Sequence, residues 1–360
     1  MKIFKLAAMV TLLCVSWTCS AAPEIYILPI PDGWTAAGEA KITKDGLYVI
    51  GHMRKHDYSQ YAAFTWRKRD PQLTIWTFPG CENEEARISD MSEEKTAILG
   101  LCKSRLGIFF KNQFRFYFPV NDAWAKWDIG MISQKGDVVC ALVTPKGAGA
   151  PYRPVRVDIL RNDDQNIYQL DDIQDLPVKE KFSSCKQMAA DGTVFTLSSS
   201  FRPWQWGAFA YDMKAPLNFD VQVSVFSGNG IFGVGTRTIG GKRTWGRVVL
   251  HQPNTWIPLA HSTSAGWDHV IDPDSISDDG KTIFGTRGDT NMGVIWREGK
   301  GWTYIDSLIT EELKLDLRGL KSHWYVKGNP EATAFVTGAY TYDAASPQKY
   351  SSKMIYVAME

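Results

Sequence analysis

The stretch "DSISDDGKTIFG", residues Asp274–Gly285, decides the fold because the chain repeats it. An earlier stretch, "AKITKDGLYVIG" (Ala40–Gly51), has the same order of residue types: isoleucine, two or three polar residues, glycine, alternating apolar residues and a second glycine. An Asp-Gly pair between two short alternating runs is typical of a tight β-hairpin, because glycine accepts the positive φ that such turns need. Each copy is therefore predicted to form one hairpin of a larger repeated unit.

Weaker copies continue along the chain at a similar spacing. Aligned on the turn, the copies place these residues at equivalent positions: Gly46, Lys95, Gly136, Gly192, Gly230, Gly280 and Thr333. Neighbouring positions are separated by 49, 41, 56, 38, 50 and 53 residues. Seven units fill the chain after its first segment.

Each unit also has a second half with strand character. In the first unit it is "AAFTW" followed by "LTIWTFP", and in the sixth it is "GVIW" followed by "GWTYI". A unit is therefore predicted to hold four antiparallel strands, and such units at this spacing are the blades of a β-propeller. We predict an all-β fold, a single propeller domain over residues 22–360 with seven four-stranded blades. Six or eight blades are the alternatives, because the third and seventh units are degenerate.

The last unit lacks a recognisable fourth strand before the chain ends at Glu360. The segment "PEIYILPIP" near the start resembles the fourth strands of other units. We therefore expect Glu24–Leu28 to pair beside Met354–Ala358, which removes the open sheet edges of a linear stack. The propeller is predicted to be closed by its N-terminal strand in the last blade.

The repeat resembles the HAF-type extracellular repeats of exported bacterial proteins. The pattern I-S-x-D-G-x-x-I-x-G, followed by an A-F-x-W-like strand, is kept best in Ile42–Trp66 and Ile276–Trp296. The resemblance implies an exported, propeller-like bacterial protein. It implies no catalytic residues.

The first segment has the order of a secretory signal peptide. Lys2 and Lys5 precede an apolar run that is too short to span a bilayer, and small residues follow it. We place cleavage after Ala21, with Ala22 as the alternative, so residues 1–21 are the signal peptide. A lipid-modified Cys14 or Cys19 is disfavoured by the large residues ahead of each. The mature protein is expected in the periplasm or outside the cell.

Charge and hydropathy exclude two classes of partner. Residues 1–21 hold two lysines and no acids, so 38 basic residues face 39 acidic ones in the mature chain. Nucleic-acid binding needs a basic footprint that this balance lacks. No later apolar run is long enough to predict a membrane span.

Four cysteines follow the signal segment. An even number in an exported chain favours disulfides, and the CxxC or Cys/His spacings of metal sites are missing from the sequence. We predict a Cys81–Cys102 bridge within the second unit, which would stabilise the fold by about 3 kcal/mol. Cys140 and Cys185 then pair by elimination and join the third and fourth units.

Catalytic motifs are weak. The chain has no GxSxG elbow and no HExxH, and "SDDGKTIF" matches a sialidase-type Asp-box only in part, which is in any case a structural turn. No cofactor and no metal are predicted, although Asp268, His269 and His323 are the most interesting grouping for a metal. Pairs of loop carboxylates leave a propeller-type glycosidase or polysaccharide lyase as the alternative function.

Tryptophans are unusually numerous. Five recur at equivalent repeat positions and are predicted to be blade core: Trp66, Trp76, Trp256, Trp296 and Trp302. Others precede first strands (Trp34, Trp124, Trp127 and Trp267) or follow a second strand (Trp204 and Trp206). In an up-and-down blade both kinds of link emerge on one face of the ring. The links on this face are also expected to carry His261, Asp268, His269 and His323.

These off-repeat aromatics predict the function. Large rings beside carboxylates and imidazoles are the usual composition of a small-ligand site. We predict an exported, non-catalytic binding scaffold whose partner is a small glycan or peptide ligand, or a surface protein. The predicted ligand-binding residues are Trp34, Trp124, Trp204, Trp206, Trp267, Asp268, His269 and His323. The alternative is that these rings only cap the ends of the blades.

Overall fold

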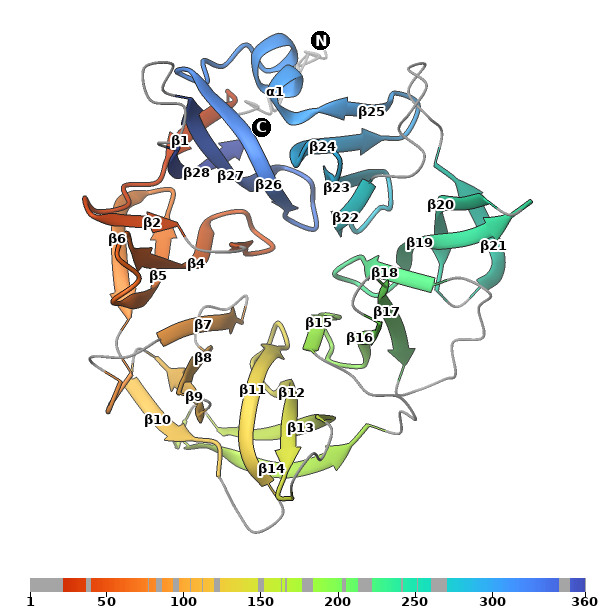
Figure 1. Cartoon of the computed structure of the whole chain (residues 1–360). Helices are drawn as coiled ribbons and strands as arrows, with labels where there is room; N and C mark the ends of the chain where they lie inside the picture. Colours follow the sequence, from red (N-terminus) through yellow and green to blue (C-terminus); the bar gives the residue numbers. More distant parts are fainter. Residues whose placement is uncertain are drawn as a thin grey trace, which may run out of the picture.

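Small antiparallel β-sheets make up almost the whole protein (Figure 1). The computed structural model describes residues 22–36, 40–76, 78–81, 86–92, 97–103, 105–111, 113–119, 124–147, 152–162, 164–165, 167–176, 184–202, 205–212, 222–240, 242–250, 252–259, 271–342 and 350–359. Helix is confined, over these residues, to α1 (Ile305–Ser307) and the π-helix η1 (Leu308–Glu312). None of the described helical segments has the length and apolarity needed to cross a membrane.

The described strands form seven sheets, numbered here in chain order. The first four are sheet 1, with β2 (Trp34–Ala36), β3 (Lys41–Ile42), β4 (Tyr48–Lys55), β5 (Tyr61–Arg67) and β6 (Asp70–Trp76); sheet 2, with β7 (Ala86–Met91), β8 (Ala97–Cys102), β9 (Arg105–Phe110) and β10 (Gln113–Tyr117); sheet 3, with β11 (Trp124–Ile132), β12 (Val138–Pro145), β13 (Arg153–Asn162) and β14 (Ile167–Asp175); and sheet 4, with β15 (Ser184–Met188), β16 (Val194–Arg202) and β17 (Gln205–Asp212).

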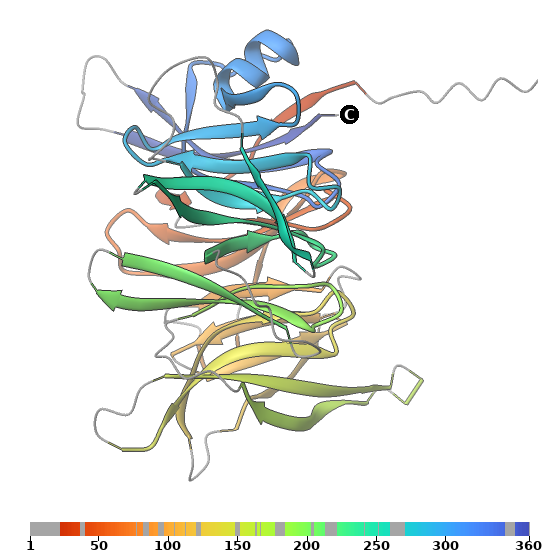
Figure 2. The same ribbon diagram turned by 90° about the vertical axis from the view of Figure 1, so that its right-hand side faces the viewer.

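The other three sheets complete the set. They are sheet 5, with β18 (Gln222–Phe226), β19 (Phe232–Ile239), β20 (Lys242–Val249) and β21 (Gln252–Pro258); sheet 6, with β22 (Ile271–Ile276), β23 (Thr282–Arg287), β24 (Met292–Arg297) and β25 (Gly301–Tyr304); and sheet 7, with β26 (Leu320–Gly328), β27 (Ala334–Tyr342), β28 (Tyr350–Ala358) and β1 (Glu24–Ile27). All seven sheets lie in chain order around a common centre (Figure 1). In sheet 7 the innermost strand is β26 and the outermost is β1. Seen edge on, the strand ends gather on two opposite faces of the ring (Figure 2).

The hydrophobic core is divided between the sheets. The buried hydrophobic residues of the described part form seven clusters, and each cluster lies between two consecutive sheets. Because both faces of a sheet are buried, its strands carry near-continuous apolar runs. Trp66 and Trp296 lie within such clusters as predicted, with 1% and 6% of their surfaces exposed.

The repeated polar motif builds the turn after each first strand. Ser277 donates its amide N–H to the Thr282 carbonyl at 2.9 Å and accepts the Thr282 N–H on its hydroxyl at 3.0 Å. The Ser277 hydroxyl donates to Asp279 at 2.6 Å, and Gly280 closes the turn with a φ of +71°. Thr43, Ser92, Ser133, Ser227 and Asn329 make the same pair of bonds to the residue five positions on.

One predicted turn position is wrong by one residue. In the seventh unit Ala332, with a φ of +54°, occupies the place of the turn glycine, and Thr333 follows it. Asn329 takes the place of the serine, because its side-chain oxygen accepts the N–H groups of Thr333 and Ala334, both at 2.9 Å. The predicted turn residue Lys95 lies outside the described residues.

The turns of consecutive sheets are hydrogen-bonded to one another. Gln134 donates its backbone N–H to the Ala190 carbonyl at 3.1 Å, and Ala190 donates to the Gly228 carbonyl at 2.8 Å. Asp278 donates to the Pro330 carbonyl at 2.6 Å. These residues each follow the first residue of their turn, so the same position is used around the ring. We call this side of the ring the turn face.

On the turn face, the turns of sheets 5, 6, 7 and 1 contact one another. The Asp278 carboxylate accepts the Asn229 N–H at 2.9 Å and lies 3.9 Å from the Lys44 ammonium. Lys44 belongs to sheet 1 and Asp278 to sheet 6, so the pair spans the turn of sheet 7. The Asn329 side-chain amide of that turn donates to the Lys44 carbonyl at 2.7 Å. Turns of sheets 5, 6, 7 and 1 therefore meet here.

The N-terminal strand pairs with the end of the chain as predicted. In β1 Glu24 lies opposite Ala358 and Ile27 opposite Ile355, and Leu28 donates its N–H to the Met354 carbonyl at 2.9 Å. Glu24 also forms an ion pair of 2.7 Å with Lys68 of sheet 1, which holds the pKa of Glu24 below its usual range. The strands β1 and β28, from opposite ends of the described chain, are thereby joined in sheet 7.

The seam between sheets 7 and 1 is sealed by aromatic rings. Trp66 lies 5.6 Å from Tyr26 and 5.1 Å from Tyr356, measured between ring centroids. The Tyr356 hydroxyl donates to the Gly46 carbonyl at 2.6 Å. Burial raises the pKa of Tyr356, so this donor keeps its proton.

Both predicted disulfides are confirmed. Cys81–Cys102 has a Cα–Cα distance of 5.9 Å and links the segment before β7 to the end of β8. Cys140–Cys185 has a Cα–Cα distance of 6.2 Å and joins β12 of sheet 3 to β15 of sheet 4. All four cysteines are buried.

A turn glycine is required both by its φ and by the neighbouring sheet. A Cβ on Gly192 would lie 2.7 Å from the Cβ of Val138 in sheet 3, whereas one on Gly240 would meet nothing within 4 Å. Both glycines have positive φ, +68° and +57°. We expect Gly240→Ala to cost about 1–2 kcal/mol of unfolding free energy, and Gly192→Ala about 2–3 kcal/mol more because the sheets must separate. Urea unfolding measures the free energy that each substitution costs. An equal loss in the two variants would refute the contribution of the contact between Gly192 and sheet 3.

Candidate functional site

Trp34, Trp124 and Trp206 lie in strands near the side of the ring opposite the turn face. Trp34 lies opposite Lys55, and Trp124 opposite Pro145, each partner being the last residue of its second strand. Trp206 lies opposite Ser200 near the end of β16. First strands begin and second strands end on this side, which we call the tryptophan face. The register thus puts the backbones of these three residues near one side of the ring, and the prediction that the tryptophans form one ligand-binding surface stays a prediction.

Several details of that prediction are wrong. Trp34 and Trp124 lie within the strands β2 and β11 and not ahead of them. Trp127 is also in β11, and it is fully buried, with its indole N–H donated to the Pro119 carbonyl at 2.9 Å. His323 lies in β26, where residues 323–325 face the single residue Gly338 of β27, and not in a link. The remaining predicted residues lie outside the described residues: Trp204, His261, Trp267, Asp268 and His269.

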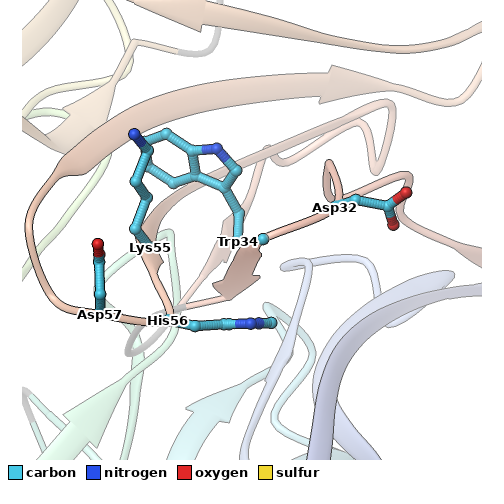
Figure 3. A pocket seen from close by; sticks show the side chains of 6 residues that line it. Asp32, Trp34, Lys55, His56 and Asp57 are labelled. Carbon is cyan, nitrogen blue, oxygen red and sulfur yellow. The ribbon is translucent and has the colours of Figure 1, made fainter.

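Trp34 borders a hollow of about 320 Å³ on the tryptophan face (Figure 3). The strand β2 supplies Trp34, and the link after β4 supplies the facing wall. The residues that line the hollow are Asp32, Gly33, Trp34, Lys55, His56 and Asp57. We call it the Trp34 hollow. Only Trp34 among these residues was predicted as a site residue, and the other five were not.

Backbone hydrogen bonds fix the walls of the Trp34 hollow. His56 donates its N–H to the Gly33 carbonyl at 3.0 Å, which ties the two walls together. Lys55 donates to the Gln60 carbonyl at 2.9 Å and so closes the loop between β4 and β5. The Trp34 ring is half-buried against the cluster between sheets 7 and 1. The hollow is therefore formed before any ligand arrives.

The charges of the Trp34 hollow are mixed. Asp57 accepts the Ser59 hydroxyl at 2.6 Å and the Ser59 N–H at 3.0 Å, and these bonds hold the pKa of Asp57 below its usual range. The Lys55 ammonium lies 5.7 Å from the centre of the Trp34 ring, a distance typical of cation–π contact. With a neutral imidazole, the two carboxylates and one ammonium give a formal charge of −1.

A second lysine and aromatic ring lie on the tryptophan face in sheet 3. The Lys126 ammonium is 5.4 Å from the ring centre of Tyr152, which precedes β13. Interaction with the Tyr152 side chain raises the pKa of Lys126. Lys126 follows Trp124 by two residues, so this pair repeats in sheet 3 the chemistry of the Trp34 hollow.

No group of three or more His, Cys, Asp or Glu residues that could hold a metal ion occurs in the part of the chain that the structure describes. The side chains of Asp268, His269 and His323 lie outside that part, so their grouping stays untested.

Comparison with known proteins bears on the fold. No family model and no curated protein sequence match the chain, so the resemblance to HAF-type repeats stays a prediction. Among solved structures, the chain is similar to the β-propeller domain of Cps50 (Swd1) from Myceliophteria thermophila, with a TM-score of 0.52 and 10% identity over 91% of this chain and 97% of that chain.

Two structures of oligogalacturonate lyase are also similar. One, in complex with manganese, has a TM-score of 0.54 and 9% identity over 93% of both chains. The other, from Vibrio parahaemolyticus, has a TM-score of 0.54 and 8% identity over 94% of this chain and 98% of that chain. The class defined by the fold is thus the β-propeller. At these identities the likeness shows the fold alone, because one fold hosts many activities.

Proposed function

We propose that residues 22–360 form one exported propeller of seven blades, closed by β1 in the last blade, after cleavage near Ala21. Seven interfaces between consecutive sheets and the β1–β28 pairing support this architecture. Two buried disulfides support export, since such bonds persist in oxidising compartments. The destination is the periplasm or the cell exterior.

The closing strand can be tested by deletion. Removing residues 22–30 should lower the melting temperature of the mature protein by about 10 °C, because β28 loses its partner and sheets 7 and 1 lose their shared aromatic seal. Deleting only residues 22 and 23, which precede β1, is the matched control. An unchanged melting temperature after deletion of residues 22–30 would contradict closure of the ring by β1.

We further propose that the protein is a non-catalytic binding scaffold whose ligand, a glycan, a peptide or a surface partner, is held on the tryptophan face. The observation that supports this proposal is the strand register, in which Trp34, Trp124 and Trp206 pair with residues at or near the ends of second strands on one side of the ring of sheets. A rigid scaffold with aromatic and charged residues at its loop ends is a common form of binding site. His323, Trp204, Trp267, Asp268 and His269 are proposed to complete the site.

Substitution of two tryptophans tests the proposed site. Trp206→Ala with Trp267→Ala should reduce binding to a glycan and peptidoglycan-fragment array by about tenfold or more, and should barely change the melting temperature, if the rings form a platform. Trp302→Ala, in the core between sheets 5 and 6, is the control that should lower the melting temperature instead.

Two results would contradict the proposal. A large loss of stability with unchanged binding would mean that Trp206 and Trp267 are core residues. Cleavage of an array glycan by the wild-type protein would favour the glycosidase or lyase alternative.

A further inference from the structure

The Trp34 hollow combines one indole with two carboxylates and one ammonium. From this combination we propose that it is a subsite for one ring of a neutral glycan, and that it discriminates against uronic acids. The inference rests on the proposed function, because it assigns a ligand class to part of the tryptophan face.

The shape of the hollow suits a sugar ring. Its volume of about 320 Å³ lies at the small end of the range for small-molecule sites. Strand pairing fixes the Trp34 backbone, and the ring is half-buried against the cluster between sheets 7 and 1, so its exposed part is a fixed platform. Pyranose rings present an apolar C–H face that packs on an indole with little loss of conformational entropy.

The polar lining suits hydroxyl groups. Asp32 and Asp57 are exposed carboxylates, which accept hydrogen bonds from donors, and every sugar hydroxyl is a donor. Ser59 engages Oδ1 of Asp57, and Oδ2 is the oxygen offered to a ligand. Lys55 and His56, which also line the hollow, supply donors for ring and hydroxyl oxygens (Figure 3).

Charge decides between a neutral and an acidic glycan. A uronate placed on Trp34 would meet two carboxylates against the single ammonium of Lys55, so its net interaction with the lining is repulsive. A neutral sugar meets no such repulsion, and both carboxylates become acceptors for it. Hydrogen bonds to charged groups are the stronger kind, so these acceptors add affinity.

A peptide is the weaker fit. Peptide anchors are apolar or aromatic side chains that fill an apolar pocket. Apart from Trp34, the lining of the hollow is glycine and polar residues, and it offers no second apolar wall among the described residues. The hollow therefore favours a flat ring over a side-chain anchor.

Calorimetry with defined oligosaccharides tests the inference. The probes are chitotetraose, cellotetraose and maltotetraose as neutral glycans, tetragalacturonate as the acidic one, and a mixed tetrapeptide library. We expect the wild-type protein to bind at least one neutral probe at least tenfold more tightly than tetragalacturonate, with an affinity that is the same at 0.05 and 0.5 M salt.

Variants assign the binding to the hollow. Trp34→Ala should abolish it, whereas Trp34→Tyr keeps a ring and should retain most of it, which separates stacking from misfolding. The double variant Asp32→Asn with Asp57→Asn should weaken binding of the neutral probe about tenfold. It should also reduce the ratio between the affinities for the neutral probe and for tetragalacturonate. The matched control is Asp191→Asn, an exposed carboxylate on the turn face that accepts the Thr193 N–H and hydroxyl as Asp57 accepts those of Ser59, and this variant should change neither.

The outcomes separate the two proposals. Binding lost in Trp206→Ala and kept in Trp34→Ala would overturn the inference and leave the proposed function standing. Preference for tetragalacturonate or for peptides would overturn the inference alone. Binding of none of the glycans or peptides would overturn the inference and leave a surface partner as the ligand of the proposed function.

Discussion

The ring depends on one constraint: the backbone N–H and C=O groups of the innermost strands must find hydrogen-bond partners in the neighbouring sheets. First strands lie at the centre, and one edge of each has no strand partner in the described sheets. Buried N–H and C=O groups must nevertheless be paired. The turns solve this for the turn face through the Gln134, Ala190 and Asp278 amides, which bond to the next turn. Turn residues at positive φ let the chain reverse close enough to its neighbour for these bonds to form.

Side chains solve the same problem within the inner strands. Asp90 of β7 accepts the Ile132 N–H of β11 at 3.0 Å, and Asp274 of β22 accepts the Val326 N–H of β26 at 3.0 Å. Gln187 accepts the Phe226 N–H at 2.9 Å and donates to the carbonyl of the same residue. Each of the accepting residues lies at a shift in the pairing of its own strand. At these bulges a polar side chain reaches the backbone of the next sheet.

The sequence predicts what local chemistry controls. The hydrogen bonds within each turn join residues at most five positions apart. Short stretches such as "SISDDG" and "KITKDG" therefore predict the turns directly. The β1–β28 pairing and both disulfides also follow, because a last unit without a recognisable fourth strand and the four cysteines after residue 21 leave few arrangements. The helical segment Ile305–Glu312 was not predicted, since its stability comes from burying Ile305, Leu308 and Ile309 between sheets 6 and 7.

The Trp34 hollow lay beyond prediction for a related reason. Lys41 pairs with Ile50, and counting back at that register places Trp34 opposite Asp57. The shift between β3 and β2 moves it opposite Lys55, so the walls of the hollow depend on a bulge that no turn signal marks. Trp127 was assigned wrongly to a link because β11 begins at Trp124, earlier than the turn pattern indicates.

Hydrogen exchange of the turn amides tests the central claim most directly. The N–H groups of Gln134, Ala190 and Asp278 lie in turns, yet each donates to the turn of the next sheet. Residue-resolved exchange should therefore find them protected to the same degree as amides of the central strands β19 and β23. The Thr290 amide, which bonds only within its own exposed turn, should exchange far faster. Equal, rapid exchange of Gln134, Ala190, Asp278 and Thr290 would contradict the account.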